Sequence, residues 1–122
     1  VETEKRFSYS KDELAEFKEL ILQKQTQAII DRDATKKLLH EFLETKEENS
    51  GFVNLEEDAL QYQSELLLLI ERQEAYLSNL KKALVRIENG SYGICRKTGK
   101  LISKERLRAV PHATLSAEAK AA

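Results

Sequence analysis

The sequence predicts a mainly α-helical protein built on a long antiparallel coiled-coil hairpin, with a small head and a short C-terminal helix. The 122 residues are enough for one domain, and 34% of them are charged while one is proline and four are glycine. This composition is typical of long helices. Two long segments have apolar residues at helical spacing, and a short segment with a single cysteine follows them. We therefore predict an N-terminal segment at 1–10, the hairpin at 11–90 and the head at 91–122.

The first helical segment is predicted to begin at a capping box. Ser10 can accept a hydrogen bond from the backbone of Glu13, while the Glu13 side chain reaches back to Ser10. Apolar side chains then follow at intervals of three and four, interrupted by Lys24 and Asp31. The predicted seam consists of Leu14, Phe17, Ile21, Ala28, Thr35, Leu38 and Phe42. Residues 49–51, Asn-Ser-Gly, indicate a helix end and a turn.

The second helical segment has an unbroken heptad pattern that is predicted to stop at Asn89 and Gly90. Its seam consists of Leu66, Ile70, Gln73, Leu77, Leu80, Leu84 and Ile87. Two such seams joined by a short turn pair as an antiparallel hairpin. The run from Leu66 to Ile70 is more apolar than the seam requires, and Leu68 in it lies roughly opposite the seam. This run forms either a wider local core or a contact surface for another protein.

The charge of the chain differs in sign between its two parts. Residues 1–90 contain 13 Lys and Arg against 19 Asp and Glu, whereas residues 91–122 contain 7 against 2. Acidic residues concentrate between Glu41 and Asp58, which gives the hairpin an acidic tip near residues 50–59. Such a tip is repelled by nucleic acid and attracted to cations or basic protein surfaces, unless it is only a solvated face.

The head contains Cys95 in the segment Tyr92-Gly93-Ile94-Cys95-Arg96-Lys97-Thr98-Gly99. A structural zinc site needs about four thiolate or imidazole ligands. The other three ligand positions of a zinc ribbon are occupied here by Thr98, Ser116 and Ala119. We therefore predict a degenerate zinc-ribbon-like head that holds no metal and no other cofactor.

Without a metal, the head must be held by packing. The residues expected to pack are Tyr92, Ile94, Leu101, Ile102, Leu107 and Leu115, with Phe7 and Tyr9 covering them. Residues 93–95 and 100–102 are predicted to form a very small hairpin around a turn at Thr98 and Gly99. Ser103 is predicted to cap a basic helical turn with Lys104, Arg106 and Arg108, which Pro111 ends.

Several classes of protein do not fit this sequence. It offers no catalytic constellation, and an enzyme with a deep pocket is not expected. It has no run of about eighteen apolar residues, and Val1 to Tyr9 lack the apolar centre of a signal peptide. One cysteine forms no internal disulfide, which is compatible with a reducing compartment. The expectation is a soluble cytoplasmic protein without a membrane partner.

The order of these features resembles the DksA/TraR family of bacterial RNA polymerase regulators. The resemblance extends from about Ser10 to the end of the chain. It is most specific between Tyr92 and Pro111, where the knuckle, the turn glycine, the basic helix and the proline keep their order. Residues 106–111, Arg-Leu-Arg-Ala-Val-Pro, correspond to the R-L-x-A-x-P segment of the family. Some members lack most of the zinc cysteines, and this chain is similar to those.

The resemblance also implies a function for the tip, which in the family enters the secondary channel of RNA polymerase near the trigger loop and bridge helix. Asn54 to Ala59 resembles the D-x-x-D-x-A tip motif, with Asn54 and Glu57 at the acidic positions and Asp58 beside them. The chain departs from the motif because Asn54 is uncharged and Glu57 is longer than Asp. The alignment also needs a shift of two residues relative to the knuckle. Acidic side chains in a first helical turn are equally explained by the helix dipole.

The resemblance implies a non-catalytic transcription regulator that binds RNA polymerase as a monomer, without sequence-specific nucleic-acid binding of its own. Expected polymerase contacts besides the tip are Leu68, Arg72, Arg106 and Arg108. A weak or absent response to ppGpp is also expected, since the best-known members have a lysine and an arginine where this chain has Asn79 and Val110.

Three alternatives remain open at this stage. A Gre-type transcript-cleavage factor would use acidic tip residues, here Glu56, Glu57 and Asp58, to hold a catalytic magnesium. A structural coiled-coil module would not bind polymerase at all. A thiol sensor would depend on Cys95 and would need a lowered thiol pKa.

Overall fold

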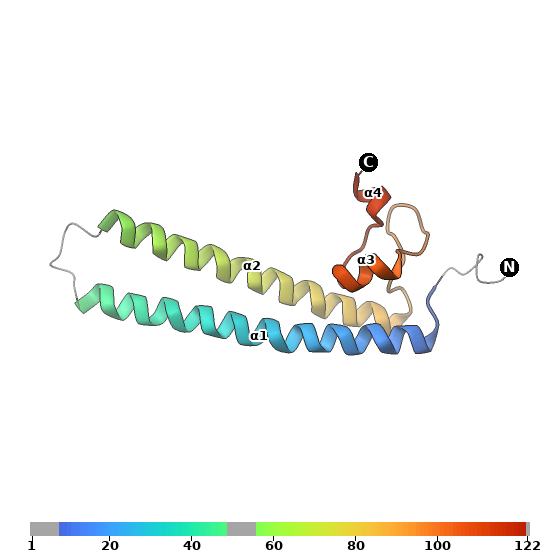
Figure 1. Ribbon diagram of the computed structural model, residues 1–122, viewed down its shortest axis with the longest axis horizontal. Coiled ribbons are helices and arrows are strands. Elements are labelled where there is room, and N and C mark those ends of the chain that lie inside the picture. Colours follow the sequence, from blue (N-terminus) through green and yellow to red (C-terminus); the bar gives the residue numbers. More distant parts are fainter. Residues whose placement is uncertain (1–7, 49–55, 122) are drawn as a thin grey trace. The chain divides into compact units, whose positions relative to one another are not determined.

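A computed structural model describes residues 8–48 and 56–121 of the chain. Within these residues the helices are α1 (Lys11–Glu48), α2 (Glu56–Asn89), α3 (Lys104–Ala109) and α4 (Ala117–Ala121) (Figure 1). The β-structure of the described residues consists of a single antiparallel bridge between Ile94 and Leu101. The mainly α-helical fold with two long helices is thus confirmed.

The chain divides into two compact units, each of which we describe by itself. The arm unit is Thr26–Leu77, and the head unit combines Val1–Gln25 with Ser78–Ala122. Both long helices contribute to both units, because each continues through the unit boundary. None of the helices in the described part of the chain is long and apolar enough to cross a membrane.

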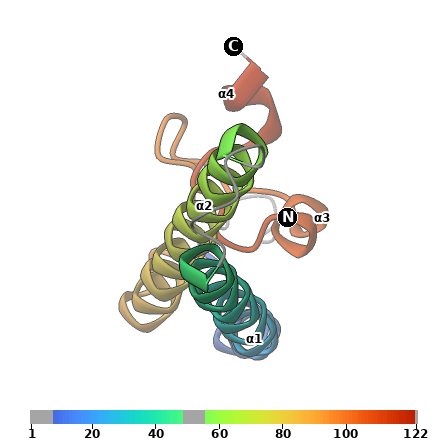
Figure 2. The same cartoon turned by 90° about the vertical axis from the view of Figure 1, so that its left-hand side faces the viewer.

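In the arm unit, α1 and α2 lie side by side (Figures 1 and 2). The buried side chains between them are Ala28, Thr35, Leu66 and Leu77. Phe42 near the end of α1 and Tyr62 near the start of α2 pack edge to face, with ring centroids 5.0 Å apart. Burying these side chains stabilises the pair by about 1.5–3 kcal/mol for each large one, before the cost in entropy.

The predicted seam of α1 is wrong at Leu38. The side chain of Leu38 is 49% exposed, and the neighbouring Leu39 is half-buried instead. Spacing alone does not separate the two leucines, because each lies three residues from one of Thr35 and Phe42 and four from the other. Leu38 lies about 100° around the helix from Leu39, which turns it away from α2.

The arm unit contains one polar layer in its seam. Thr35 is 5% exposed, and its hydroxyl donates to the backbone oxygen of Asp31 at 3.0 Å. The same hydroxyl accepts a hydrogen bond from the side-chain amide of Gln73, also at 3.0 Å. On the surface beside this layer, Arg32 and Lys36 both pair with Glu74, at 3.5 and 3.1 Å.

In the head unit, α1 begins at the predicted capping box. The Ser10 backbone donates to Glu13 Oε1 at 3.0 Å, and the Glu13 backbone donates to Ser10 Oγ at 3.2 Å. In the same unit α2 stops at Asn89, and Gly90 has a φ of 81°, as expected for a glycine that ends a helix. Both predicted helix ends are therefore confirmed.

The core of the head unit joins the hairpin to the segment after it. It contains Tyr9, Phe17, Ile21, Leu80, Ala83, Tyr92, Cys95, Ile102 and Leu107, all of them buried. Tyr92 is fully buried, and its hydroxyl donates to the backbone oxygen of Pro111 at 2.7 Å. Its ring packs against Phe17, with centroids 5.4 Å apart. The aromatic side chains thus connect α1 with the segment that carries α3.

Candidate functional site

The knuckle around Cys95 is a tight, hydrogen-bonded loop. The backbone N–H of Cys95 donates to the oxygen of Lys100 at 2.8 Å, and Gly99 N–H donates back to the oxygen of Cys95 at 2.9 Å. Gly99 has a φ of 74°, which only glycine adopts without strain. Together with the Ile94–Leu101 bridge, this loop is the small hairpin predicted around Thr98 and Gly99.

The sulfur of Cys95 is buried at the centre of this loop and accepts hydrogen bonds. Its side chain is 1% exposed, and the backbone N–H of Ser116 donates to Sγ at 3.3 Å. The hydroxyl of Thr98, and then the backbone N–H groups of Ser116, Thr98 and Lys97, lower the pKa of the thiol to about 6. Donors that would surround a metal-bound thiolate therefore stabilise a free thiolate here.

Hydrogen bonds link all four degenerate zinc positions, directly or through Ser116. Thr98 and Ser116 both contact Cys95, and the Ser116 hydroxyl accepts from the backbone N–H of the buried Ala119 at 3.1 Å. The four side chains are a thiol, two hydroxyls and a methyl group. A structural zinc ion needs about four thiolate or imidazole donors. The side chains at these positions therefore do not fit a zinc ion.

Tyr9 anchors the knuckle from outside the head segment. Its hydroxyl donates to the backbone oxygen of Ile102, and its ring meets Phe17 edge on at 5.6 Å. The ring also lies against Gly93, where an added Cβ would come within 2.6 Å of it. The predicted cover over the head is thus present at Tyr9, while Phe7 lies outside the described residues.

The basic helix α3 begins at Ser103, whose hydroxyl accepts from Arg106 N–H at 3.2 Å, as predicted. Lys104 pairs with Glu13 at 2.6 Å, so it ties α3 to the start of α1. The guanidinium of the half-buried Arg106 donates to the oxygen of Leu115 at 2.8 Å. Arg108 is exposed. Of the two arginines proposed to contact a partner, Arg106 therefore also has a structural role.

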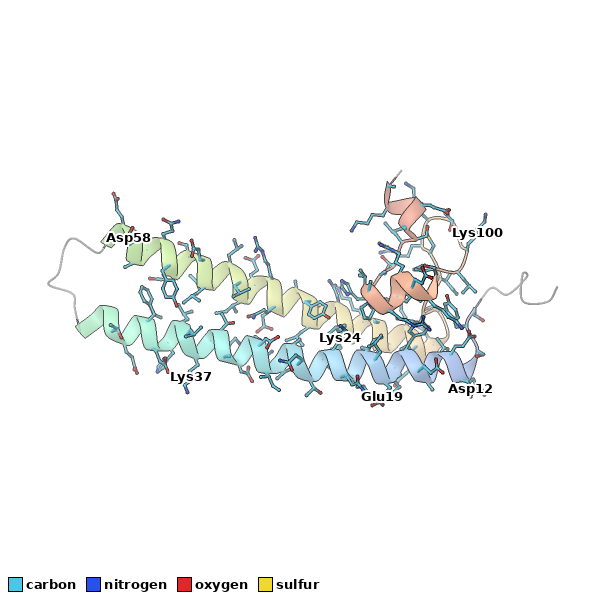
Figure 3. The ribbon with its side chains drawn as sticks, in the orientation of Figure 1. Asp12, Glu19, Lys24, Lys37, Asp58 and Lys100 are labelled. Carbon is cyan, nitrogen blue, oxygen red and sulfur yellow. The ribbon has the colours of Figure 1, made fainter. Side chains whose placement is uncertain are left out.

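The residues of the predicted tip are only partly described. Asn54 lies outside the described residues, and so does the turn that precedes α2. Glu57 and Asp58 are exposed in the first turn of α2, and Ala59 is half-buried (Figure 3 labels Asp58). Further along the same helix, Leu68 is 47% exposed and Arg72 is exposed.

Three further cations, Arg96, Lys97 and Lys100, were not predicted from the sequence as binding residues. All three are exposed on the loop between Cys95 and Leu101 (Figure 3 labels Lys100). Arg96 and Lys97 line a concavity of about 380 Å³ together with Thr114 and Leu115. The excess of positive charge after residue 90 was the available signal, but it does not show which cations lie next to a hollow.

Comparisons with known proteins agree with this geometry. Residues 90–122 match the sequence family described as prokaryotic dksA/traR C4-type zinc finger. The RNA polymerase-binding transcription factor DksA of Caulobacter vibrioides is 49% identical over 49 residues, which is 40% of this chain and 34% of that protein. General stress protein 16O of Bacillus subtilis is 47% identical over 45 residues, 37% of this chain and 28% of that protein. The matched part is thus about a third of these relatives or less.

The likeness to a solved structure covers more of the chain. The structure of transcription factor DksA2 from Pseudomonas aeruginosa superimposes with a TM-score of 0.77 at 27% sequence identity. The match covers 88% of this chain and 80% of that one. The similarity therefore includes the helical hairpin, for which the sequence matches alone give little information.

Proposed function

We propose a function from the premise that this chain belongs to the DksA/TraR family: it binds bacterial RNA polymerase and regulates transcription without catalysing a reaction. The main support is the combination of a DksA-like hairpin with a head whose sequence matches the family. The name of the Caulobacter relative includes RNA polymerase binding. We place the protein in the cytoplasm, where its proposed partner is found, and expect it to act there as a monomer without a cofactor.

We further propose where the start of α2 lies on the polymerase. The acidic tip enters the secondary channel, and Glu57 and Asp58 act on the catalytic region there. Both carboxylates are exposed at the first turn of α2, so they are available to a partner. Leu68, Arg72, Arg106 and Arg108 would contribute to affinity. The family resemblance implies that the protein inhibits initiation at promoters whose complexes with polymerase are unstable.

The first experiment tests binding. Core RNA polymerase is immobilised, and the purified protein is passed over it at several salt concentrations. We expect saturable binding of one protein per polymerase. Absence of binding under all conditions would leave a structural coiled-coil function and overturn the proposal.

The second experiment separates the tip from the rest of the surface. Glu57→Gln combined with Asp58→Asn should change polymerase affinity by no more than about threefold, because most affinity comes from a few larger contacts. The same variant should lose the effect on promoter transcription. Glu16→Gln with Glu19→Gln, two exposed carboxylates on α1, is the matched control and should behave as the wild type. If the tip variant loses affinity but is active when bound, the tip is an anchor.

A transcript-cleavage assay separates this function from that of a Gre-type factor. The protein is added to a backtracked elongation complex in magnesium. We expect no acceleration of cleavage. Acceleration that disappears in the Glu57→Gln and Asp58→Asn variant would assign the catalytic alternative instead.

A further inference from the structure

The loop between Cys95 and Leu101 presents three exposed cations, Arg96, Lys97 and Lys100. Some other cations are paired within the chain: Lys36 with Glu74 and Lys104 with Glu13. Across residues 8–45 and 57–121, Arg96, Lys97 and Lys100 form no ion pair, and all three are exposed. Their charge is therefore available to another molecule.

The backbone that carries these cations is held in place. The N–H of Arg96 donates to the oxygen of Thr114 at 2.8 Å, and the N–H of Lys100 donates to Thr98 Oγ1 at 3.2 Å. The turn itself is closed by the pair of hydrogen bonds between Cys95 and residues 99 and 100. A surface that is ordered before binding loses less entropy when a ligand docks.

The concavity beside the loop combines charge with apolar surface. It is lined by Arg96, Lys97, Thr114 and Leu115. Its volume of about 380 Å³ is at the small end of the range for ligand pockets. A space of this size accommodates a few side chains of a partner better than it would a large cofactor.

We propose that this concavity is a docking site for an acidic protein segment. The planar guanidinium of Arg96 suits a carboxylate, which it can bind through two parallel hydrogen bonds. Lys97 and Lys100 attract neighbouring carboxylates, while Leu115 contacts an apolar side chain of the segment. The identification of the partner as RNA polymerase rests on the proposed function, whereas the site itself does not.

An acidic protein segment fits this loop better than nucleic acid does. Binding to nucleic acid depends on the number of phosphates that are neutralised, and three cations neutralise few. Proteins that hold single strands also stack bases on aromatic side chains. The loop sequence from Arg96 to Lys100 contains no aromatic residue.

The site is tested first without polymerase. A short glutamate peptide containing one leucine is titrated into the isotopically labelled protein, and amide shifts are followed by nuclear magnetic resonance. We expect the shifts to concentrate at residues 96–97 and 114–115. Shifts spread evenly over all exposed lysines, or tighter binding at this loop by a single-stranded oligonucleotide of similar length, would overturn the proposal.

Charge reversal provides the matched comparison. Arg96→Glu with Lys97→Glu should weaken peptide binding about tenfold and flatten its salt dependence. Lys18→Glu with Lys24→Glu changes the net charge equally at exposed positions of α1 and should stay within about twofold of the wild type. Equal losses in both would show attraction by net charge alone. Arg96→Gln, which should weaken binding less, guards against misfolding of the doubly reversed variant.

The same variants are then tested on core polymerase. If the loop variant alone loses affinity for polymerase about tenfold, the docking site and its partner are both supported. If wild-type protein binds the peptide at the loop but does not bind polymerase, the site stands and the proposed function fails. If polymerase binds both variants as it binds the wild type and the peptide does not bind, the function stands and the site fails.

Discussion

Hydrogen bonds hold Cys95 at a position where the family's sequence description implies a metal. The thiol has a hydroxyl and backbone N–H groups as donors, and its pKa is lowered to about 6. The buried Ala119 shows that this is a rebuilt site and not one missing only an ion, because an alanine side chain offers no ligand atom. The state of this one thiol should therefore affect the stability of the head.

The pH dependence of stability tests this directly. An unfolded cysteine has a pKa of about 8.5, so between about pH 6 and 8.5 the unfolded chain binds more protons than the folded one. The contribution of the thiolate to the free energy of unfolding should rise through that window, and it is lost as pH falls through about 6. Denaturant unfolding of the wild type and Cys95→Ser, compared at about pH 7 and 9, measures it.

We expect the wild type to gain stability relative to Cys95→Ser on going to the higher pH. The titration of His112 does not contribute to the difference between about pH 7 and 9. Burial, with help from Arg86 and Lys120, lowers the pKa of His112 from 6.5, so its effect lies at more acidic pH. Parallel curves for the two proteins would mean that the thiol has the same pKa in the folded and the unfolded chain.

Two glycines provide a matched test of the Tyr9 anchor. Gly90 and Gly93 have similar φ angles, 81° and 79°, but only Gly93 has a side chain, that of Tyr9, in the way of a Cβ. Gly90→Ala should cost about 1–2 kcal/mol for its backbone conformation alone. Gly93→Ala should cost about 1–3 kcal/mol more, because the Tyr9 ring must move. Thermal or denaturant unfolding measures both.

The double variant makes the assignment specific. In a Tyr9→Ala background the extra cost of Gly93→Ala should disappear, leaving the cost seen at Gly90. An extra cost that persists without the tyrosine ring would mean that another part of the head opposes the Cβ.

At the scale of elements, periodicity predicts a helix face better than it predicts each member of the face. Leu38 and Leu39 are adjacent leucines, and either one continues a three-four pattern from Thr35. The structure selects Leu39, which is half-buried while Leu38 is exposed, a choice that the spacing leaves open. Thr35 and Gln73 were placed correctly in the two seams, but their hydrogen bond joins residues 38 apart, which no local pattern reports.

The Thr35–Gln73 layer should cost stability in exchange for fixing the register of the two helices. Gln73 Oε1 is buried and has no hydrogen-bond partner within the described residues. Replacing both residues with apolar ones of similar size, Thr35→Val with Gln73→Leu, should raise the free energy of unfolding by about 1–3 kcal/mol. Thr35→Val alone should lower it by about 1–3 kcal/mol, since the Gln73 amide then loses its acceptor.

Gln73→Leu alone should cost less, because the Thr35 hydroxyl keeps its bond to Asp31. A double-mutant cycle by denaturant unfolding provides the coupling energy. Additive single effects would show that the two side chains do not act as a pair.

At the scale of the whole molecule, the sequence was most informative where chemistry is local. The capping box at Ser10, the stop at Gly90 and the cap at Ser103 each depend on residues within one turn, and all are confirmed. The contact of Tyr9 with Ile102 spans 93 residues and depends on how the head packs. Site residues at the tip stay predictions, because an exposed carboxylate is consistent with a partner and with water alike.

Absence of zinc from the folded protein is a prediction about the whole head. Elemental analysis of protein purified without chelator should find zinc far below one atom per chain, since one thiol cannot complete a tetrahedral site. The melting temperature should not change with a chelator. Near-stoichiometric zinc, or a sharp fall in melting temperature with chelator, would contradict the account of Cys95 as a hydrogen-bonded thiolate.

The response to ppGpp is a property of the protein and its proposed partner together. In the family a composite site uses a lysine on the second arm and an arginine before the proline, because a polyphosphate demands cations. The corresponding residues here, Asn79 and Val110, are uncharged and half-buried. Lys81 and Lys82 are exposed but lie about 200° and 300° around the helix from Asn79. We therefore expect little synergy between this protein and ppGpp in promoter transcription, measured with and without ppGpp on a polymerase whose other ppGpp site has been removed.

Asn79→Lys with Val110→Arg should increase this synergy if the missing charges are the cause of the weak response. Strong synergy in the wild type would show that other residues form the site.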